Sequence, residues 1–261
     1  MRKDAIVIEE ARVGSVHELD DYKSFRERHR IFPDVFENRN HKTILDVAAG
    51  VGVVGKRIKD HYPTDLLCND ISPTCLKCMK KIGIKTTSFD IDNNENSFPF
   101  PNESIDAIIA LATIEHVIHI DHFMKEIHRI LSQNGFLYIS APNYTGILYL
   151  LPFLISGKTF HDPLSEDSKY EFYAHVRYFT YKTLLDFVSS FGFYIDSVYL
   201  PIPKGSSNYQ ALKAKSKLKA MVFYLAMKSL YTFFTPRWAS EPVLCFRKNG
   251  TFNHKIRKVI L

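Results

Sequence analysis

The stretch Thr43-Ile-Leu-Asp-Val-Ala-Ala-Gly-Val-Gly52 indicates the fold of the chain. Its apolar first six residues predict a buried strand, and the helical spacing of residues 53–61 predicts a helix directly after it. Gly50, Gly52 and Gly55 at the junction match the pattern G-x-G-x-x-G. Such a turn lets the backbone approach a ligand at the beginning of a helix, and dinucleotides and S-adenosylmethionine both bind in this way. The stretch therefore predicts a cofactor-binding corner without choosing between these two ligands.

Predicted strands and helices alternate on both sides of this corner. Short apolar runs are separated by segments of helical spacing that begin at capping residues such as Ser72 and Thr180. This order predicts an α/β fold with helices on both faces of a mostly parallel sheet and with the ligand at the carboxyl ends of the strands. The predicted strands are 43–48, 65–69, 85–90, 105–112, 136–140, 193–202 and 243–247, and the predicted helices are 53–61, 73–83, 121–131 and 180–192.

Two long connections interrupt the later part of this pattern. Residues 144–179 are rich in aromatic side chains, and residues 203–242 form a segment far longer than a hairpin loop. We expect both connections to form helical caps over the substrate side of a main domain that spans 42–261. A separate N-terminal helical segment is expected over 1–41, because its apolar positions have helical spacing.

The segment 211–235 within the second connection allows two interpretations. Lys213, Lys215, Lys217 and Lys219 precede an apolar run of helical spacing. A basic flank beside an apolar helix is typical of contact with an anionic membrane surface, but the same residues also suit a buried cap helix. The run is shorter than the roughly 20 residues that span a bilayer. We expect a cytoplasmic protein, with the substrate cap as the preferred interpretation and peripheral membrane contact as the alternative.

The spacing of the cysteines does not indicate a metal site. Cys75 and Cys78 form a C-x-x-C, but no second pair occurs at the spacing of a zinc ribbon. We expect two reduced thiols on the surface of a helix.

Three aspartates stand at the ends of the first three predicted strands. Asp46 would repel a pyrophosphate but attract a sulfonium and an ammonium group, while Asp70 could accept hydrogen bonds from both ribose hydroxyls. Asp90 could accept a hydrogen bond from the adenine amine. Since Asp70 suits NAD equally well, a nicotinamide-dependent oxidoreductase stays an alternative. Three acids at consecutive strand ends favour S-adenosylmethionine.

Four blocks succeed one another at family-like spacing: TILDVAAGVG, LLCNDIS, SFDIDNNENSFPFPNESIDAIIALATIEHV and IDHFMKEIHRILSQNGFLYISAPN. They cover about residues 42–143, and HVRYFTYKTLLDFVSSFGF at 175–193 extends the pattern. In these blocks the chain resembles the class I S-adenosylmethionine-dependent methyltransferases, in the branch similar to ubiquinone- and menaquinone-biosynthesis enzymes and to methyltransferases of glycans and small molecules. The resemblance implies a Rossmann-like, doubly wound, seven-stranded sheet whose last strand is antiparallel. It also implies S-adenosylmethionine as cofactor and S-adenosylhomocysteine as product.

The same resemblance assigns cofactor contacts by position. Ala48 is the one departure, because the family usually has glycine there and alanine is accommodated only at a negative φ. This residue keeps a non-catalytic, methyltransferase-like binding module as an alternative. The glycine turn, the acids and the resemblance together predict cofactor contacts from Asp46, Ala48, Gly50, Gly52, Asp70, Ile71, Asp90, Ile91 and Leu111, the last beside the sulfonium.

Three histidines at three-residue spacing come after Glu115. On a helix His116, His119 and His122 would diverge around the axis, so no metal site is expected from them. The family resemblance covers Glu115 and His116 but neither of the later histidines. We expect Glu115, His116 and His175 to be the catalytic residues beside the methyl group, where a base can activate an acceptor hydroxyl.

The sequence at the end of the fourth predicted strand narrows the class of acceptor. The net charge of +6 favours anionic partners in general. However, the sequence Ala110-Leu-Ala-Thr113 lacks the [D/N/S]-P-P-[Y/F/W] block of enzymes that methylate amines of nucleic acids. We therefore expect O-methylation of a small-molecule, glycan or lipid-linked acceptor, and no nucleic acid partner.

Overall fold

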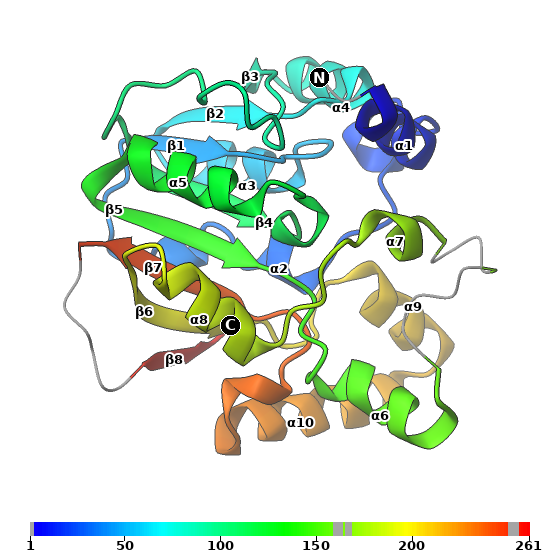
Figure 1. Cartoon of the computed structure of the whole chain (residues 1–261). Coiled ribbons are helices and arrows are strands. Elements are labelled where there is room, and N and C mark those ends of the chain that lie inside the picture. Colours follow the sequence, from blue (N-terminus) through cyan, green and yellow to red (C-terminus); the bar gives the residue numbers. More distant parts are fainter. Residues whose placement is uncertain (1–2, 159–163, 165–168, 250–255) are drawn as a thin grey trace.

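The computed structural model describes residues 3–158, 164, 169–249 and 256–261, and within them eight strands form one sheet (Figure 1). The strands lie in the order β3-β2-β1-β4-β5-β7-β6-β8. Neighbouring strands run parallel except at β7, which is antiparallel to both β5 and β6. The strands are β1 Thr43–Asp46, β2 Asp65–Asn69, β3 Lys85–Thr87, β4 Ile105–Leu111, β5 Leu131–Ser140, β6 Phe193–Leu200, β7 Val243–Lys248 and β8 Arg257–Ile260.

Helices fill the connections, and capping residues begin two of them as predicted. Ser72 Oγ accepts a hydrogen bond of 3.1 Å from Cys75 N, and Thr180 Oγ1 accepts one of 3.1 Å from Thr183 N. The α-helices are α1 Lys3–Val13, α2 Glu27–Arg30, α3 Val53–His61, α4 Pro73–Lys81, α5 Ile120–Ile130, α6 Ile147–Ser156, α7 Lys169–Ala174, α8 Tyr181–Ser189, α9 Ser207–Lys215 and α10 Lys217–Phe233. The 3-10 helices are η1 Leu19–Asp21, η2 Asp34–Phe36, η3 Ile114–His116 and η4 Pro236–Trp238.

The sheet is covered on both faces, as the alternation of strands and helices predicts. Along β4, Ile108 and Ala110 pack in a cluster with buried residues of α5, α8 and α10. Ala107 and Ile109, which point the other way, pack with residues of α3, α4 and the segment around α2. The α/β, Rossmann-like architecture is therefore confirmed, with the two cores lying on opposite sides of one sheet.

The expected number of seven strands is wrong, because β8 adds an eighth. Its backbone pairs in parallel with β6, with Leu200 opposite Ile260. The half-buried Val259 and Leu261 pack against the core, and this burial stabilises the pairing of the segment with the edge strand β6. Arg30 then fixes the end of the chain, since its Nη2 donates a hydrogen bond of 3.0 Å to Leu261 O. The antiparallel direction of β7 is confirmed.

Most predicted boundaries shift by a few residues, and two of these shifts change where strands of the sheet begin or end. The third strand ends at Thr87 rather than at Asp90. The helix predicted over 121–131 ends at Ile130, and β5 begins at once at Leu131 instead of at Phe136. The early start of β5 contains a register shift against β4, which the apolar pattern of 136–140 alone does not reveal.

Cys75 and Cys78 are buried rather than on a helix surface. Both lie on the face of α4 that packs with Val13 and Val16, at the end of α1 and just beyond it. The expectation of surface thiols failed because the N-terminal segment covers this face of α4.

Both long connections contain helices. The first holds α6 and α7, and the second holds α9 and α10. Figure 1 shows α7, α9 and α1 on the side of the sheet toward which the arrowheads of β1 and β5 point. Among the residues that the structure describes, no helix combines the length and the apolar character needed to cross a membrane.

Candidate cofactor and acceptor site

The glycine turn after β1 brings backbone into contact with Asp70. Gly50 and Gly52 have φ angles of 56° and 90°, and Gly52 is the N-cap of α3. Gly50 N donates a hydrogen bond of 2.8 Å to Asp70 Oδ2. A Cβ at position 52 would lie 2.6 Å from Met79 Cγ, so both φ and packing require glycine there.

Both carboxylate oxygens of Asp70 are held by backbone. Besides the bond from Gly50, Oδ1 accepts a hydrogen bond of 2.9 Å from Ser72 N. The side chain is buried, and burial raises the pKa of Asp70 to about 7. Because each carboxylate oxygen has two lone-pair sites, this fixed carboxylate can still accept hydrogen bonds from ribose hydroxyls.

Asp46 is the second buried acid at this corner. Burial, followed by the charge of nearby Asp70, raises the pKa of Asp46 to about 7, although Ala48 N donates a hydrogen bond to it. A cationic group beside the two acids would offset both the desolvation and the mutual repulsion. The pair therefore fits a cofactor with ammonium and sulfonium groups, and it does not fit a pyrophosphate.

Asn69 organises this corner, although no motif predicted a role for it. Its Nδ2 donates hydrogen bonds to Val47 O at 2.9 Å and to Phe89 O at 3.2 Å, and its Oδ1 accepts one of 2.8 Å from Phe89 N. The buried amide thus ties the loop after β1 to the loop after β3. A polar residue in the apolar strand before Asp70 was the signal that could have identified it.

These bonds of Asn69 also explain why Asp90 does not end a strand. Phe89 pairs with the amide of Asn69 and so leaves the sheet, which places Asp90 and Ile91 in a half-buried turn. Asp90 Oδ1 accepts a hydrogen bond of 3.0 Å from Asp92 N. The expected strand-end position of Asp90 is therefore wrong, while its carboxylate still lies in the loop beyond β3.

Asp92 connects that turn to the loop after β4. Its Oδ1 accepts hydrogen bonds from Ile118 N at 2.9 Å and from His119 N at 2.6 Å. Sequence reasoning missed this residue, because its partners lie more than twenty positions away along the chain.

Strained backbone adjoins the half-buried Leu111 at the end of β4. Ala112 has a φ of 48°, which is rare for a residue with a Cβ and costs about 1–3 kcal/mol. Its N–H donates a hydrogen bond of 2.9 Å to Ser140 O at the end of β5. The strain is therefore stored directly before η3, which carries Glu115 and His116.

Glu115 presents a buried carboxylate at this edge of the sheet. The residue is 1% exposed, and none of the other described residues donates a hydrogen bond to either carboxylate oxygen. Burial raises the pKa of Glu115 to about 8. Such a group is costly to the fold, which indicates a role for it beyond packing.

The segment after α7 lies against η3 and brings a second histidine to Glu115. Val176 N donates a hydrogen bond of 3.0 Å to Glu115 O, and His116 Nδ1 donates one of 3.0 Å to Ala174 O. The ring centroids of His116 and His175 lie 4.7 Å apart at an interplanar angle of 73°. The structure thus brings together the three residues that were predicted to be catalytic.

Arg177 and Tyr144 support this arrangement. The Arg177 guanidinium donates hydrogen bonds to Val117 O and, at 2.7 Å, to Ile118 O. Tyr144 Oη lies 3.4 Å from His175 Nδ1. The position of the segment is therefore fixed by backbone and side-chain contacts from several elements.

The other two histidines of the motif lie elsewhere. His119 is exposed, and the Nε2 of His122 donates a hydrogen bond of 3.1 Å to Asn96 O. His116 is the one member of the three that faces His175.

The N-terminal segment also reaches this end of the sheet. Arg28 of α2 forms an ion pair with Glu241, which lies just before β7. The charges of both residues act on Glu115. Residues from both ends of the chain therefore surround the predicted acceptor side.

The sequence itself identifies the family. Residues 16–198, well over half of the chain, match the family model described as a methyltransferase domain. The chain belongs to this methyltransferase family. No curated protein sequence matches this methyltransferase.

Solved structures share its fold at low sequence identity. An S-adenosylmethionine-dependent methyltransferase from Thermotoga maritima, described as a possible histamine N-methyltransferase, is 17% identical with a TM-score of 0.58, over 94% of this chain and 97% of its own. The [4+2]-cyclase SpnF is 15% identical with a TM-score of 0.58, over 94% and 93%. Phosphoethanolamine N-methyltransferase 2 from Haemonchus contortus, in complex with S-adenosylmethionine, is 16% identical with a TM-score of 0.57, over 95% of this chain and 57% of its own.

The methyltransferase is an enzyme that uses S-adenosylmethionine, which decides against the oxidoreductase alternative. Ala48, the departure from the family pattern, does not adopt a positive φ, so alanine introduces no backbone strain there. The buried acids Asp46 and Asp70 fit the positive groups and the ribose of this cofactor.

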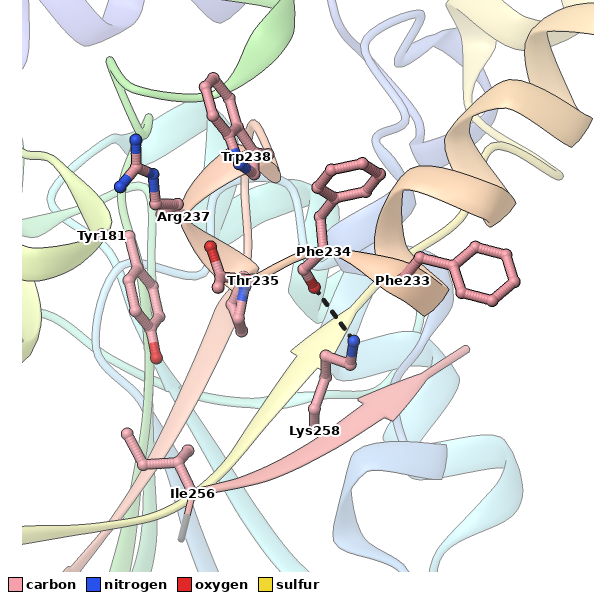
Figure 2. A pocket seen from close by; sticks show the side chains of 9 residues that line it. Tyr181, Phe233, Phe234, Thr235, Arg237, Trp238, Ile256 and Lys258 are labelled. Carbon is pink, nitrogen blue, oxygen red and sulfur yellow. Dashed lines mark hydrogen bonds between the residues drawn. The ribbon is translucent and has the colours of Figure 1, made fainter. Parts of the chain in front are cut away.

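A separate cavity of about 750 Å³ lies away from the glycine turn, between the end of α10, η4 and the start of β8 (Figure 2). Lys258 stands at its wall and donates hydrogen bonds to Thr232 O at 2.8 Å and to Phe234 O at 3.1 Å. None of the residues predicted to bind the cofactor or to act in catalysis lines this cavity.

Proposed function

We propose that the methyltransferase transfers a methyl group by in-line displacement to an oxygen atom of a small-molecule, glycan or lipid-linked acceptor. Bound S-adenosylmethionine supplies a methyl group that its sulfonium already activates. The protein must then align the acceptor and exclude water. The observation that carries the proposal is the cluster of the buried Glu115 and His175 with the half-buried His116 at the carboxyl end of β4.

A side chain of this cluster can accept the proton of an acceptor hydroxyl. Since His116 donates its Nδ1 proton to Ala174 O, its Nε2 carries the lone pair and can accept a proton. Glu115 lies beside it and can share or stabilise that charge. A base at this position is useful for a hydroxyl, whereas a neutral amine can attack without one.

A polar acceptor is also supported by buried polar atoms around the cluster. Ser140 Oγ, Ser240 Oγ and Arg28 Nε have no hydrogen-bond partner among the described residues, as is true of the Glu115 oxygens. Glu115 follows β4, Ser140 ends β5 and Ser240 stands just before β7, so these three lie at the same end of neighbouring strands, whereas Arg28 comes from α2. Buried polar groups are normally satisfied, so an acceptor with several hydroxyl groups would complete them.

The domain organisation proposed for this function has the main domain over 42–261, the N-terminal segment 1–41 beside it, and substrate caps at 144–179 and 203–242. Support comes from His175, which reaches the cluster from the first of these connections. Glu241, near the end of the second connection, forms an ion pair with Arg28 of the N-terminal segment. Covering the acceptor from three directions would exclude water during transfer.

A lipid-linked acceptor is favoured within this class by apolar surface on the caps. Leu151, Leu154 and Ile155 of α6 are exposed, as are Met221 and Leu225 of α10. Exposed apolar residues grouped on neighbouring helices mark an interaction surface. We infer peripheral membrane contact through 211–235 and α6, with the acceptor reaching the site from the lipid phase.

Calorimetry with S-adenosylhomocysteine and a product assay test the proposal. Wild-type protein should bind with saturable 1:1 stoichiometry, Asp70→Ala should lose at least about 10-fold in affinity, and Asp65→Ala at the opposite end of β2 should bind normally. Acceptor panels of phenols, polyols and polyprenyl-linked sugars are then screened for methylated product by mass spectrometry. Undiminished binding of S-adenosylhomocysteine by Asp70→Ala would refute the cofactor assignment. A product methylated on nitrogen would refute O-methylation.

One alternative uses the same cofactor corner without methyl transfer. It is favoured by the similarity to a structure whose described activity is a cyclisation. Cofactor binding together with a rearranged but unmethylated product would select this alternative.

A further inference from the structure

Two imidazoles and one carboxylate converge at the carboxyl end of β4. One ligand atom from each of Glu115, His116 and His175 lies within 4.8 Å of the others. Metal–ligand bonds of about 2.0–2.2 Å place ligand atoms roughly 3–4 Å apart, so small side-chain rotations bring these three to a common centre.

Glu115 supplies the independent observation that points to a ligand. Its carboxylate is buried, and no other described residue donates a hydrogen bond to either oxygen. Burying such a group without a partner costs stability, whereas coordination of a cation satisfies it. Its neighbouring backbone is strained at Ala112, which further indicates that the position of the side chain matters.

The histidine beside it is already oriented as a ligand. His116 donates its Nδ1 proton to Ala174 O at 3.0 Å, which fixes the ring and leaves the lone pair on Nε2. A hydrogen bond from the other ring nitrogen to a backbone carbonyl is the usual support of a metal-bound histidine. His175 is held next to it by the backbone bond of the next residue, Val176, to Glu115.

The charges around Glu115 are also compatible with a bound cation. Arg28, whose half-buried guanidinium acts electrostatically on Glu115, is paired with Glu241. The two charges of this pair act on Glu115 in opposite directions, so the pair supplies no full counter-charge, and a divalent ion would stabilise the buried carboxylate in its ionised form.

We propose that Glu115, His116 and His175 bind a divalent first-row transition-metal ion, of the class of Zn²⁺ or Mn²⁺. Two imidazole nitrogens favour such an ion over Mg²⁺ and Ca²⁺, which prefer oxygen ligands alone. Three protein ligands leave a coordination position for an acceptor oxygen. The inference rests on the proposed function and deepens it. The ion would bind the lone pair of His116 Nε2, which was assigned above to proton removal, and would lower the pKa of the bound acceptor hydroxyl. The hydroxyl proton would leave to water, after which the oxygen attacks the methyl carbon and the carbon–sulfur bond breaks.

The test uses the untagged full chain after chelator treatment and dialysis. Titration with ZnCl₂ in a calorimeter should give one saturable site, and CoCl₂ should give the visible absorption of a coordinated Co²⁺ ion. Glu115→Gln, which keeps the side-chain shape, and His175→Ala should each weaken Zn²⁺ binding by at least about 10-fold. MgCl₂ at the same concentration should give no comparable signal.

His119→Ala combined with His122→Ala is the matched control, since both histidines lie outside the cluster. It should bind Zn²⁺ as the wild type does. Circular dichroism and S-adenosylhomocysteine affinity report whether each variant is folded. The inference is overturned if wild-type protein shows no saturable site, if Glu115→Gln binds undiminished, or if the control variant loses the site. Normal cofactor binding without metal binding would refute this inference alone, whereas metal binding without cofactor binding would refute the proposed function.

Discussion

His116 and His175 lie edge to face with ring centroids 4.7 Å apart, although one comes after β4 and the other after α7. The contact is held by backbone, because Glu115 O accepts hydrogen bonds from Val176 and Arg177. A connection outside the regular alternation of strands and helices therefore brings His175 to the residues that follow β4. In the proposed mechanism this cluster acts on the acceptor, and it is separate from the residues proposed to bind the cofactor.

That separation predicts the behaviour of His116→Ala. We expect turnover to fall by about 10²–10⁴-fold, because the side chain that receives or directs the acceptor proton is removed. Cofactor affinity should change less than about 2-fold, since Asp46 and Asp70 lie at the ends of other strands. Single-turnover rates and calorimetry measure the two effects. His119→Ala is the control, and an equal loss of turnover in that variant would contradict the assignment.

Asp46→Asn should have opposite effects on stability and on cofactor binding. Burial raises the pKa of Asp46 to about 7 from its ordinary value of 3.8. The unfolded chain therefore loses this proton near pH 4 and the folded chain only near pH 7, so stability falls as pH rises between these values and stays low above them. Asparagine removes that cost. The cofactor-free variant should melt at a higher temperature than wild type at pH 8, and the difference should shrink as pH falls toward 4.

The same variant should bind S-adenosylmethionine at least about 10-fold more weakly at pH 8, because the negative charge that attracts the cofactor is gone. Wild-type affinity should decline between pH 8 and pH 6, as Asp46 becomes protonated, while the affinity of the variant stays flatter. Differential scanning fluorimetry and calorimetry across this range check both statements. A wild-type affinity that rises as pH falls would refute the electrostatic role of Asp46.

Local signals were sufficient to predict most of the sheet and the glycine turn after β1. The apolar runs, the caps at Ser72 and Thr180 and the glycine turn each depend on a few neighbouring residues, and each formed as predicted. The failures involve distant partners. Asp90 left the sheet because Phe89 bonds to Asn69, and Cys75 is buried because α1 covers α4.

The acceptor side was predictable only in part for the same reason. Glu115 and His116 stand in a recognisable block after β4, and His175 begins another. Their convergence with the Arg28–Glu241 ion pair depends on how α2, the first connection and the segment before β7 pack together. No spacing within the sequence encodes that arrangement.

The glycine turn offers a matched pair of substitutions. Gly52→Ala introduces a Cβ 2.6 Å from Met79 Cγ at a φ of 90°, whereas Gly50→Ala meets no heavy atom within 4 Å at a φ of 56°. We expect Gly52→Ala to lower the free energy of unfolding by about 2–4 kcal/mol and Gly50→Ala by about 1 kcal/mol. Urea denaturation of the cofactor-free proteins measures both. Equal losses would show that φ alone, and not packing against Met79, decides the need for glycine at position 52.

The apolar surface of the caps predicts contact with anionic membranes. Tyr231 of α10 bonds to the backbone of Ser240, and the backbone of Gly146 before α6 packs against the same residue, so the two helices share one region of the molecule (Figure 1). Leu154 and Ile155 of α6 are 69% and 75% exposed, and the basic flank of α10 is exposed as well. Wild-type protein should therefore sediment with vesicles that contain phosphatidylglycerol, and less so at high salt.

Leu154→Glu combined with Ile155→Glu should weaken this binding by about 10²-fold, since burial of each side chain in the interface contributes about 1.5–3 kcal/mol. Val7→Glu combined with Ile8→Glu is the control. These residues are also exposed, but they belong to α1, which packs against α4 and lies far from α6 (Figure 1). The control should sediment as wild type does. If both variants lose binding equally, charge rather than the apolar face of α6 governs the interaction, and if wild type does not sediment at all, the acceptor must reach the site from water.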